Sequence, residues 1–365
     1  MKVIHILTYM QKASGVSSFV AGSSAALCDN GIHVDIATEG IGASDQCPVD
    51  SRVGLFRLAT VDRDFIESYD IIHIHGLWSP ILHKINRICF KYHKPIVLSP
   101  HGGLSPWAMS HKWWKKFLPW HLYQKSDVKD AQLIHATSEQ EARWISNLGF
   151  MQQIVVAPLG TNVREPDGPD MDTNTILFVG RVYPVKALDR LIMAFALVQT
   201  NLRNGWKLRI VGPDQAGYLK ELKQLVQTLE LEGFVEFPGC KYGQDLDAEY
   251  NKCAALALVS HTENFGSTVV EAMAHGKPCI TSVFTPWSEL QTFKCGWWVS
   301  NEPEKLAEAL QELMSMPEER RREMGENGRK RVLYFYSWKK IAQKLASAYE
   351  QLKCERPDNP EVRND

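Results

Sequence analysis

Long apolar segments are missing from this chain of 365 residues. Its longest uninterrupted apolar runs, such as Ala254 to Val259, fall far short of the roughly 20 residues that a membrane-spanning helix needs. The opening segment, MKVIHILTYMQK, lacks both the apolar region and the cleavage site of a secretory signal. We therefore expect a cytoplasmic protein that does not cross a membrane and whose first segment is a β-strand.

Other absences narrow the class of protein. The eight cysteines form no C-x-x-C pair and no metal-binding spacing with histidine, so we expect reduced thiols. A net charge of -1 gives no overall attraction to nucleic acid, and no nucleic-acid-binding module is recognisable. No G-x-G-x-x-G follows the first predicted strand, which argues against a dehydrogenase.

What is present is an alternation of short β-rich runs with helical stretches, as a parallel α/β sheet requires. The 44% of hydrophobic residues can supply two cores in a chain of this length. Strands are predicted at Val3–Thr8, His33–Thr38, Ile71–His75, Ile96–Ser99, Leu133–Ala136, Ile154–Ala157, Thr175–Val179, Lys207–Val211, Val235–Phe237, Ala255–Val259 and Pro278–Thr281.

The two series of strands are separated by residues 164–172, whose prolines and acids fit neither periodicity. We place the domain boundary there and predict two Rossmann-like domains, residues 1–164 and 173–335, that face each other across a cleft. Residues 336–352 are predicted to form a helix that crosses back to the first domain.

The segment from Ser260 to Pro278 carries the strongest chemical signal. It follows a buried strand and opens a helix at a glycine, so the N–H groups near Ser267 and Thr268 are free donors suited to a diphosphate. Glu263 and Glu271 lie eight positions apart, roughly 12 Å along a helix, which exceeds the separation of a hydrolase's carboxylate pair. They fit better as contacts to two parts of one long ligand.

This E-x7-E pattern resembles glycosyltransferase family 4, whose members have the GT-B fold. The resemblance implies that Glu263, counted as catalytic, contacts hydroxyls of the donor sugar and that Glu271 contacts the ribose. The residues between them are then donor-binding as well: Asn264, Phe265, Gly266, Ser267 and Thr268.

A second strand-to-helix turn carries two cations, Arg181 and Lys186, after Gly180. Negative charge develops on a departing nucleoside diphosphate, and fixed cations stabilise it more in the transition state than in the ground state. The segment is similar to the family's G-R-x-x-x-x-K-G, with Ala187 in place of the last glycine. The resemblance therefore implies that Gly180, Arg181 and Lys186 bind the diphosphate, with the two cations counted as catalytic.

In the first domain, His101 follows a predicted strand and precedes two glycines, so it can face the edge where ligands bind in open α/β sheets. Family members carry a histidine here, near the donor sugar and the acceptor, which implies a catalytic and acceptor role. Gly15 opens the first helix and is predicted to help bind the donor. Trp78 and Trp107 are candidate acceptor residues because sugar faces stack on aromatic rings.

Between Asp70 and Asp127 there is no acidic residue, whereas eight Lys or Arg, seven His and several Trp occur. An interfacial membrane surface, with Trp at headgroup depth and lysines on anionic lipid, explains both parts of this pattern. The predicted patch consists of Lys112, Trp113, Trp114, Lys115 and Lys116. Packing or acceptor recognition by the tryptophans is the alternative.

Three D-x-D triplets occur, at Asp62, Asp170 and Asp245, but none ends a predicted buried strand as a metal-binding triplet would. We predict no metal and no cofactor, the nucleotide sugar being a substrate. The predicted function is a retaining, metal-independent transfer of sugar from a UDP- or GDP-linked donor to a glycan or lipid-linked glycan, on the inner face of the plasma membrane, in synthesis of lipopolysaccharide or another cell-surface polysaccharide. The alternatives are a nucleotide-sugar epimerase of the same fold and a catalytically silent binding subunit.

Overall fold

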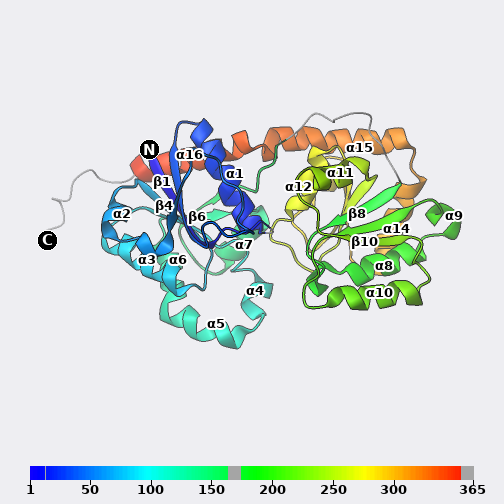
Figure 1. The fold of residues 1–365 in the computed structure, drawn as a ribbon, viewed down its shortest axis with the longest axis horizontal. Helices are drawn as coiled ribbons and strands as arrows, with labels where there is room; N and C mark the ends of the chain where they lie inside the picture. Colours follow the sequence, from blue (N-terminus) through cyan, green and yellow to red (C-terminus); the bar gives the residue numbers. More distant parts are fainter. Residues whose placement is uncertain (13, 163–173, 355–365) are drawn as a thin grey trace. The chain divides into compact units, whose positions relative to one another are not determined.

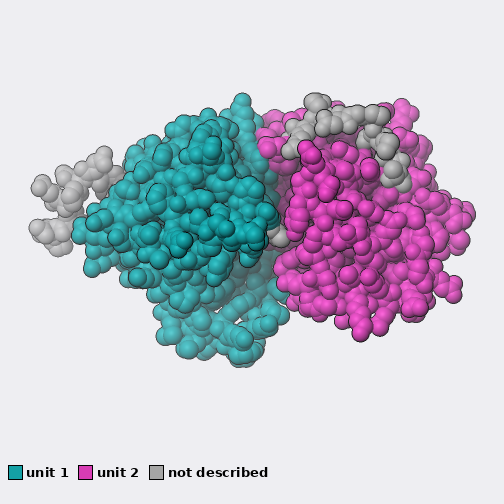
Figure 2. All heavy atoms as spheres, viewed as in Figure 1, with its two compact units in different colours: residues 1–160, 338–365 teal, residues 161–337 magenta. Residues whose placement is uncertain are grey.

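The computed structural model describes residues 1–12, 14–162 and 174–354. Contacts within the chain divide it into two compact units, residues 1–160 with 338–365 (unit 1) and residues 161–337 (unit 2), coloured separately in Figure 2. Each unit is built on one parallel sheet with connecting helices (Figure 1), so the predicted α/β class with two Rossmann-like domains is confirmed. The predicted linker, residues 164–172, lies outside the described residues.

Unit 1 holds a seven-stranded parallel sheet in the order β3-β2-β1-β4-β5-β6-β7. The strands are β1 (Lys2–Tyr9), β2 (His33–Glu39), β3 (Gly54–Arg57), β4 (Ile71–His75), β5 (Ile96–Ser99), β6 (Leu133–Ala136) and β7 (Gln153–Val156). The chain winds outward in one direction from β1 and in the other from β4. The carboxyl ends of β1 and β4 therefore meet at the point where open α/β sheets bind ligands.

The helices of unit 1 include one from the far end of the sequence, α16, which packs against α1. The ring of Trp338 lies so close to Gly22 of α1 that a Cβ there would stand 2.1 Å from it. The helical segments are α1 (Gly15–Asp29), η1 (Leu58–Thr60), α2 (Arg63–Glu67), α3 (Pro80–Lys91), α4 (Pro106–Ser110), α5 (Trp113–Pro119), the π-helical η2 (Trp120–Gln124), α6 (Lys125–Asp130), α7 (Glu139–Asn147) and α16 (Trp338–Cys354).

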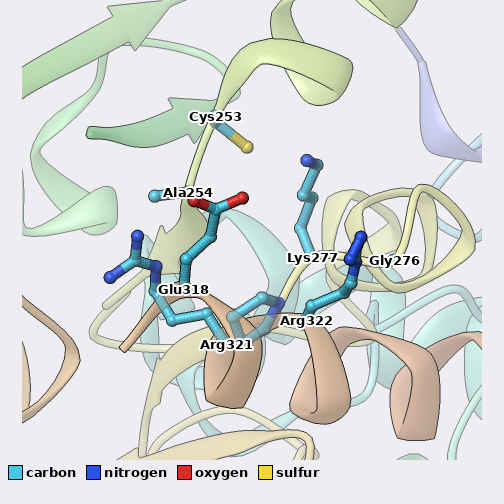
Figure 3. Close-up of a pocket in the computed structure, with 8 residues that line it drawn as sticks. Cys253, Ala254, Gly276, Lys277, Glu318, Arg321 and Arg322 are labelled. Atoms are coloured by element: carbon cyan, nitrogen blue, oxygen red, sulfur yellow. The ribbon is translucent and has the colours of Figure 1, made fainter. Parts of the chain in front are cut away.

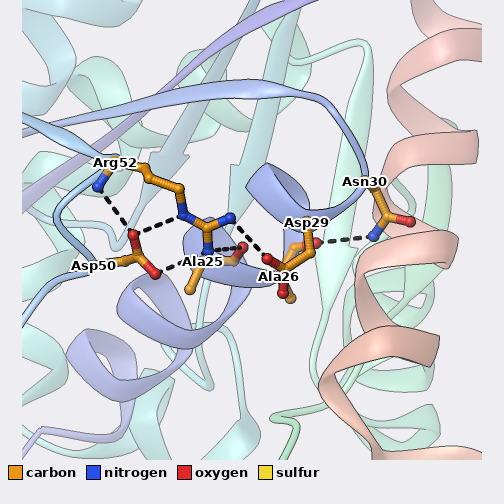
Figure 4. Close-up of polar contacts among 6 residues, drawn as sticks. All are labelled: Ala25, Ala26, Asp29, Asn30, Asp50 and Arg52. Atoms are coloured by element: carbon orange, nitrogen blue, oxygen red, sulfur yellow. Dashed lines mark hydrogen bonds and ion pairs between the residues drawn. The ribbon is translucent and has the colours of Figure 1, made fainter.

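Two apolar layers enclose the sheet of unit 1, as the two-residue period of a strand predicts. In β1, Val3 and Leu7 belong to the layer under α1 and α16, whereas Ile4 and Ile6 belong to the layer on the opposite face. Outside the core, Arg52 joins Asp50 and, at 2.8 Å, the Asp29 carboxylate at the end of α1 (Figure 4). These ion pairs are solvent-exposed, so we expect them to add little to stability.

Unit 2 holds a six-stranded parallel sheet in the order β10-β9-β8-β11-β12-β13, with its change of direction between β8 and β11. The strands are β8 (Thr175–Val179), β9 (Lys207–Val211), β10 (Val235–Gly239), β11 (Ala255–Leu258), β12 (Cys279–Ser282) and β13 (Gly296–Val299). The short strands β3 and β13 are absent from the prediction; both lie at an edge of their sheet.

The helical segments of unit 2 are η3 (Pro184–Lys186), α8 (Leu188–Leu197), α9 (Thr200–Arg203), α10 (Tyr218–Thr228), α11 (Gln244–Lys252), α12 (Ser267–Ala274), α13 (Glu289–Thr292), α14 (Pro303–Ser315), α15 (Glu318–Arg331) and the π-helical η4 (Val332–Tyr336). Among the helices that the structure describes, none is both long and apolar enough to span a bilayer.

Candidate active site

The predicted donor residues of unit 2 gather at the carboxyl ends of β8 and β11. Gly180 directly follows β8, and the loop with Glu263 follows β11. These two strands are neighbours at the point where the strand order changes direction. The sheet topology thus brings together two segments that are about 80 residues apart in sequence, at the edge where ligands bind in this fold class.

The turn after β8 depends on a close backbone approach at Gly212, the residue after β9. A Cβ at this position would lie 1.8 Å from the carbonyl oxygen of Gly180, and its φ of 146° is also one that other residues avoid. The Gly180 N–H donates to the Val211 carbonyl at 3.0 Å, and Val182 N–H donates to Pro213 at 2.8 Å. Gly212 is therefore required for the position of the turn that carries Arg181.

Lys186 and Glu263 form an ion pair across the two loops, with both side chains mostly buried. The Ser260 hydroxyl donates to the same carboxylate oxygen, Oε1, at 3.0 Å. The loops are also joined through their backbones, because His261 N–H donates to the carbonyl of Val185 at 2.8 Å. An anion that binds Lys186 must therefore share the ammonium group with Glu263.

The start of α12 forms the other side of this site. Gly266 adopts a φ of 78°, and a Cβ there would stand 2.7 Å from the Leu258 side chain. The helix has no side-chain cap, so its first N–H groups are available to an anion. The indole of Trp287 donates to the Phe265 carbonyl at 2.5 Å and fixes the loop before the helix. Among the described residues, the buried hydroxyl oxygen of Thr268 has no hydrogen-bond partner.

Glu271, in the second turn of α12, accepts a hydrogen bond from the Tyr250 hydroxyl at 2.7 Å. Burial raises the pKa of Glu271 above its usual range, while hydrogen bonds from Tyr250 and Ser267 oppose that rise. Burial also raises the pKa of Tyr250, with the Glu271 charge adding to the effect, so the tyrosine stays a donor. Tyr250 was not among the predicted site residues.

Arg181 is exposed, and its guanidinium donates to Gln215 Oε1 at 3.1 Å.

Ala187, directly after Lys186, is buried and has a φ of 52°, in the left-handed region. This backbone conformation explains why glycine suits the position in the family pattern.

In unit 1, His101 follows β5 in a turn with a left-handed φ of 49°. The turn is fixed by the buried carboxylate of Glu141: its Oε1 accepts from Gly102 N–H at 2.5 Å, and its Oε2 accepts from the N–H and the hydroxyl of Thr137, each at 2.8 Å. Glu141 therefore ties the turn after β5 to the turn after β6. Glu141 was not among the predicted site residues. The pKa of His101 itself is lowered to about 3 by burial and by the nearby His135.

Gly15 is the first residue of α1, whose cap is Ser14, and a Cβ on Gly15 would meet no atom within 4 Å. Trp78 is half-buried and also has a left-handed φ, 65°. The backbone N–H of Trp78 donates to Gln124 Oε1 at 2.6 Å, which joins the turn after β4 to the π-helical segment η2. Trp107 is exposed and stacks on the His111 ring at 4.9 Å.

The helices α4 and α5 lie away from the strands of unit 1 (Figure 1), and large apolar side chains are exposed on them. Trp113 and Trp114 are each 62% exposed, and Leu122 in η2 is 70% exposed. Phe117 and Leu118, not part of the predicted patch, are exposed as well.

The inclusion of Lys116 in the predicted patch is not supported, because this side chain turns inward. Its ammonium group donates to the carbonyl of Ala108 and lies 5.7 Å from the Trp78 ring centre. Burial lowers its pKa. Lys112 and Lys115 remain exposed, with the Lys115 ammonium 5.0 Å from the Trp114 ring.

The basic interval between Asp70 and Asp127 is not one surface. His73 and His75 are buried within β4. Arg87 pairs with Asp130 at 2.8 Å, beyond the interval. Of the predicted patch, Lys112, Trp113, Trp114 and Lys115 are exposed, and further exposed apolar residues lie near them on α4, α5 and η2.

A small pocket lies elsewhere in unit 2, and its labelled residues converge in Figure 3. Its lining includes Ala254, directly before β11, and Pro278, directly before β12, so it sits at the amino-end edge of the sheet. The predicted donor residues are at the opposite edge. This pocket is therefore separate from the candidate site.

Solved structures share this fold over nearly the whole chain. Sucrose-phosphate synthase from Thermosynechococcus elongatus matches with a TM-score of 0.77 and 22% identity, covering 98% of this chain and 100% of that one. HepE from Anabaena, in complex with UDP and glucose, matches with a TM-score of 0.77 and 20% identity, covering 96% and 100%. The chain has the GT-B glycosyltransferase fold, as predicted.

Two family models match adjoining parts of the chain. The model for glycosyl transferases group 1 matches residues 161–331, and that for Glycosyltransferase Family 4 matches residues 13–165. The chain belongs to glycosyltransferase family 4.

Curated relatives match over shorter stretches. A GDP-mannose:cellobiosyl-diphosphopolyprenol alpha-mannosyltransferase of Xanthomonas oryzae pv. oryzae is 27% identical over 64% of this chain and 61% of its own length. An MMP alpha-(1->4)-mannosyltransferase of Mycolicibacterium hassiacum is 23% identical over 78% of this chain and 71% of its own. The first three relatives are covered over 61%, 49% and 40% of their lengths.

Proposed function

We propose that the protein is a retaining glycosyltransferase that moves a sugar from a nucleoside-diphosphate sugar to a hydroxyl of a glycan or lipid-linked glycan. The observation that carries the proposal is the convergence of Lys186, Glu263 and the uncapped start of α12 at the carboxyl edge of β8 and β11. A cation, a carboxylate and free N–H groups at one sheet edge suit a ligand with a diphosphate next to a sugar.

Each group has a role in this proposal. Lys186 and Arg181 would neutralise the charge that develops on the departing diphosphate. The N–H groups of α12 and the unpaired hydroxyl of Thr268 would add hydrogen bonds to the phosphates. Glu263 would accept from the donor sugar's hydroxyls and Glu271 from the ribose. An unsatisfied buried hydroxyl costs about 1–3 kcal/mol, so a ligand oxygen at Thr268 would recover that energy.

We infer that no divalent metal is needed. Two of the three D-x-D triplets are near helix starts: Asp62 caps α2 by accepting from Phe65 N–H at 2.9 Å, and Asp245 and Asp247 lie in the first turn of α11. The third triplet, at Asp170, lies outside the described residues. Retention would follow if the acceptor hydroxyl attacks from the face that the diphosphate leaves, with the donor phosphate taking the proton.

The names of similar proteins support two candidate donors. The Xanthomonas relative is named for GDP-mannose, and the Anabaena structures hold UDP or UDP-glucose. Another structural neighbour, WaaG, is described as involved in lipopolysaccharide biosynthesis. We therefore propose a UDP- or GDP-linked sugar as donor and a role in cell-surface polysaccharide synthesis, with His101 of unit 1 assigned to the acceptor and sugar.

The test is an assay for release of UDP or GDP from a panel of nucleotide sugars, with and without a panel of glycan and lipid-linked glycan acceptors, in excess chelator. We expect release that depends on an acceptor, continues in chelator and gives a product whose anomeric configuration, measured by NMR, matches that of the donor. Interconversion of nucleotide sugars without an acceptor would identify an epimerase instead. A strict requirement for manganese or magnesium would contradict metal independence, and inversion would contradict the retaining assignment.

We also propose that the exposed aromatic and basic residues of α5 and η2 bring the protein to an anionic membrane, the inner face of the plasma membrane being the predicted location. The support is the exposure of Trp113, Trp114 and Leu122 beside Lys112 and Lys115. Each lysine near anionic lipid contributes about 1 kcal/mol, attenuated by salt over roughly 10 Å.

Liposome co-sedimentation tests this assignment. We expect binding to anionic vesicles that weakens as salt rises and that is lost in a Lys112→Glu, Lys115→Glu variant. Turnover of a soluble acceptor should be unchanged in that variant. The matched control, Lys116→Gln, should retain binding because Lys116 turns inward. Equal binding by the double charge-reversal variant would remove the patch from the proposal.

A further inference from the structure

Beneath His101, unit 1 holds a group of buried polar side chains. Alternate residues of a strand share a face, and His5, His73, His75, Ser99 and His135 all lie on the face covered by α1 and α16. The histidine at position 135 stacks on Phe19 of α1, with ring centres 4.8 Å apart. Burial lowers the pKa of each of these four histidines, so they are neutral near pH 7.

The hydrogen-bond directions of one series can be derived completely. His135 Nε2 lies 2.6 Å from the carbonyl of Ala157, which can only accept, so the proton is on Nε2. Its Nδ1 must then accept from the Ser99 hydroxyl, at 2.6 Å. Ser99 in turn accepts from His73 Nε2 at 2.6 Å, and His73 Nδ1 accepts from Tyr349 of α16 at 2.6 Å. Every member of this series is satisfied.

The second series ends at the candidate site. His5 Nδ1 lies 2.7 Å from His75 Nε2, and His75 Nδ1 lies 2.9 Å from His101 Nε2. Three neutral imidazoles in a row allow two proton arrangements. In the first, each ring donates its hydrogen bond toward His101, and His5 Nε2 carries no proton. In the second, each ring donates toward His5, and His5 Nε2 carries a proton.

The buried end of the series distinguishes these arrangements. Among the described residues, His5 Nε2 has no hydrogen-bond partner, and the residue is fully buried. Buried N–H groups without an acceptor are rarer than buried acceptors without a donor. The arrangement with a bare Nε2 on His5 is therefore favoured. It places the protons on His5 Nδ1, His75 Nδ1 and His101 Nδ1.

We propose that His75 and His5 are positioning residues that hold His101 as its neutral Nδ1–H tautomer, so that His101 offers a hydrogen-bond donor to a substrate hydroxyl or sugar oxygen and does not act as a base. The substrate part of this inference rests on the proposed function. A histidine in water favours the opposite tautomer, with the proton on Nε2, so the arrangement is a diagnostic property of this protein. Because the series ends at an unpartnered nitrogen, it offers no exit for a proton.

Long-range proton–nitrogen correlation NMR of the wild-type protein near pH 7 tests the tautomer without any substrate. The His101 signals are assigned by their loss in His101→Asn. We expect the proton on Nδ1 and an unprotonated Nε2. A proton on Nε2, or a charged ring, would overturn the proposal.

Two variants separate positioning from a merely structural role. His75→Phe should return His101 to a mixture dominated by the Nε2–H form and lower kcat roughly tenfold, the worth of one oriented hydrogen bond, with little change in donor KM. The matched control, His135→Phe, removes a buried histidine that does not bond to this series and should leave the His101 tautomer unchanged. An unchanged tautomer in His75→Phe would overturn the proposal.

If His75→Phe does not fold, the wild-type spectrum and two variants at His5 still test the proposal. His5→Gln keeps an N–H donor for His75 and should preserve the tautomer, whereas His5→Leu should not. His5, His73 and His75 also place ligand atoms within 4.8 Å of one another. Stoichiometric bound metal that shifts their signals on removal would therefore overturn the proposal. Calorimetric titration of UDP and GDP in the same samples tests the proposed function separately, because it does not depend on His101.

Discussion

At the carboxyl edge of β8 and β11, charged side chains hold one another in place: Lys186 pairs with Glu263 beside an uncapped helix start. At the carboxyl edge of the sheet in unit 1, after β4 and β5, neutral imidazoles are found instead, with His75 bonded to His101. Under the proposed function, the two edges would bind different parts of the substrates. Fixed charge suits a diphosphate, whereas uncharged donors and acceptors suit sugar hydroxyls and do not compete for the phosphates.

The largest predicted effect is a loss of folding stability at low pH in unit 1 that unit 2 does not share. His5, His73, His75 and His135 are almost fully buried and their pKa values are lowered, so the unfolded chain binds protons below about pH 6.5 that the folded chain does not. Their stabilisation is complete above that pH and is lost as pH falls, by about 1.4 kcal/mol per histidine per pH unit. Four together approach the whole stability of a domain within one or two pH units.

Hydrogen exchange, corrected for the intrinsic pH dependence, measures this loss separately in each unit. Peptides of β1, β4 and β6 should lose protection between pH 6.5 and pH 5, while peptides of β8 and β11 should keep it. Equal loss in both units would contradict the account of the buried histidines.

A smaller effect is expected at the turn after β8. Gly212→Ala places a methyl group against the Gly180 carbonyl, so we expect about 2 kcal/mol more destabilisation than from Gly205→Ala. Gly205 is a matched control because its φ is also positive, 88°, but nothing lies within 4 Å of its Cβ position. Urea unfolding followed by hydrogen exchange in β8 and β9 measures the difference. Similar destabilisation by both variants would show that the close approach is not important.

Tyr250→Phe should have a more local effect. Loss of the hydroxyl removes a hydrogen bond that lowers the pKa of Glu271, so the carboxyl will protonate at a higher pH. We expect affinity for UDP or GDP to fall roughly three- to tenfold, about 1 kcal/mol, and to fall further as pH decreases. Tyr242→Phe, at an exposed tyrosine of the same unit, is the control. Calorimetry at two pH values checks both the size and the sign.

The smallest effect is expected for Ala187→Gly. Glycine relieves a left-handed φ by about 1 kcal/mol, but it loses a buried methyl group, worth about 0.8 kcal/mol, and increases the entropy of the unfolded chain. These terms nearly cancel, so the unfolding free energy should change by less than about 1 kcal/mol. A larger change in either direction would show that one of these terms has been misjudged.

Local patterns predicted much of the fold. The strands Thr175–Val179 and Lys207–Val211 agree with the structure to the residue. The first is a fully buried run, the second mixes buried and half-buried residues, and a glycine directly follows each. The edge strands Gly54–Arg57 and Gly296–Val299 were not predicted, because each begins with glycine and neither is a fully buried run like the four-residue strand Ile96–Ser99. The Glu263 and Glu271 pair was recognisable because its spacing is local.

Contacts between residues that are far apart in the sequence were not predictable in the same way. Tyr250 lies 21 residues from Glu271, and Glu141 lies 39 residues from Gly102, so only the sheet topology brings them together. The alternation Ile72-His73-Ile74-His75 was a usable signal, because it places both histidines on one face of a strand. Because both histidines are buried in β4, they add nothing to the basic surface of the interval between Asp70 and Asp127.

The most direct test of the central claim is calorimetric titration of UDP and GDP into wild type, Lys186→Ala and Glu263→Gln, with Lys220→Ala, an exposed lysine of α10, as the control. We predict that Lys186→Ala weakens binding at least tenfold, about 1.4 kcal/mol, and that the control has no effect. Glu263→Gln should bind the nucleoside diphosphate at least as tightly as wild type, because Lys186 is no longer shared with a carboxylate. Wild-type affinity in Lys186→Ala for both nucleotides would contradict the assignment of this sheet edge as the donor site.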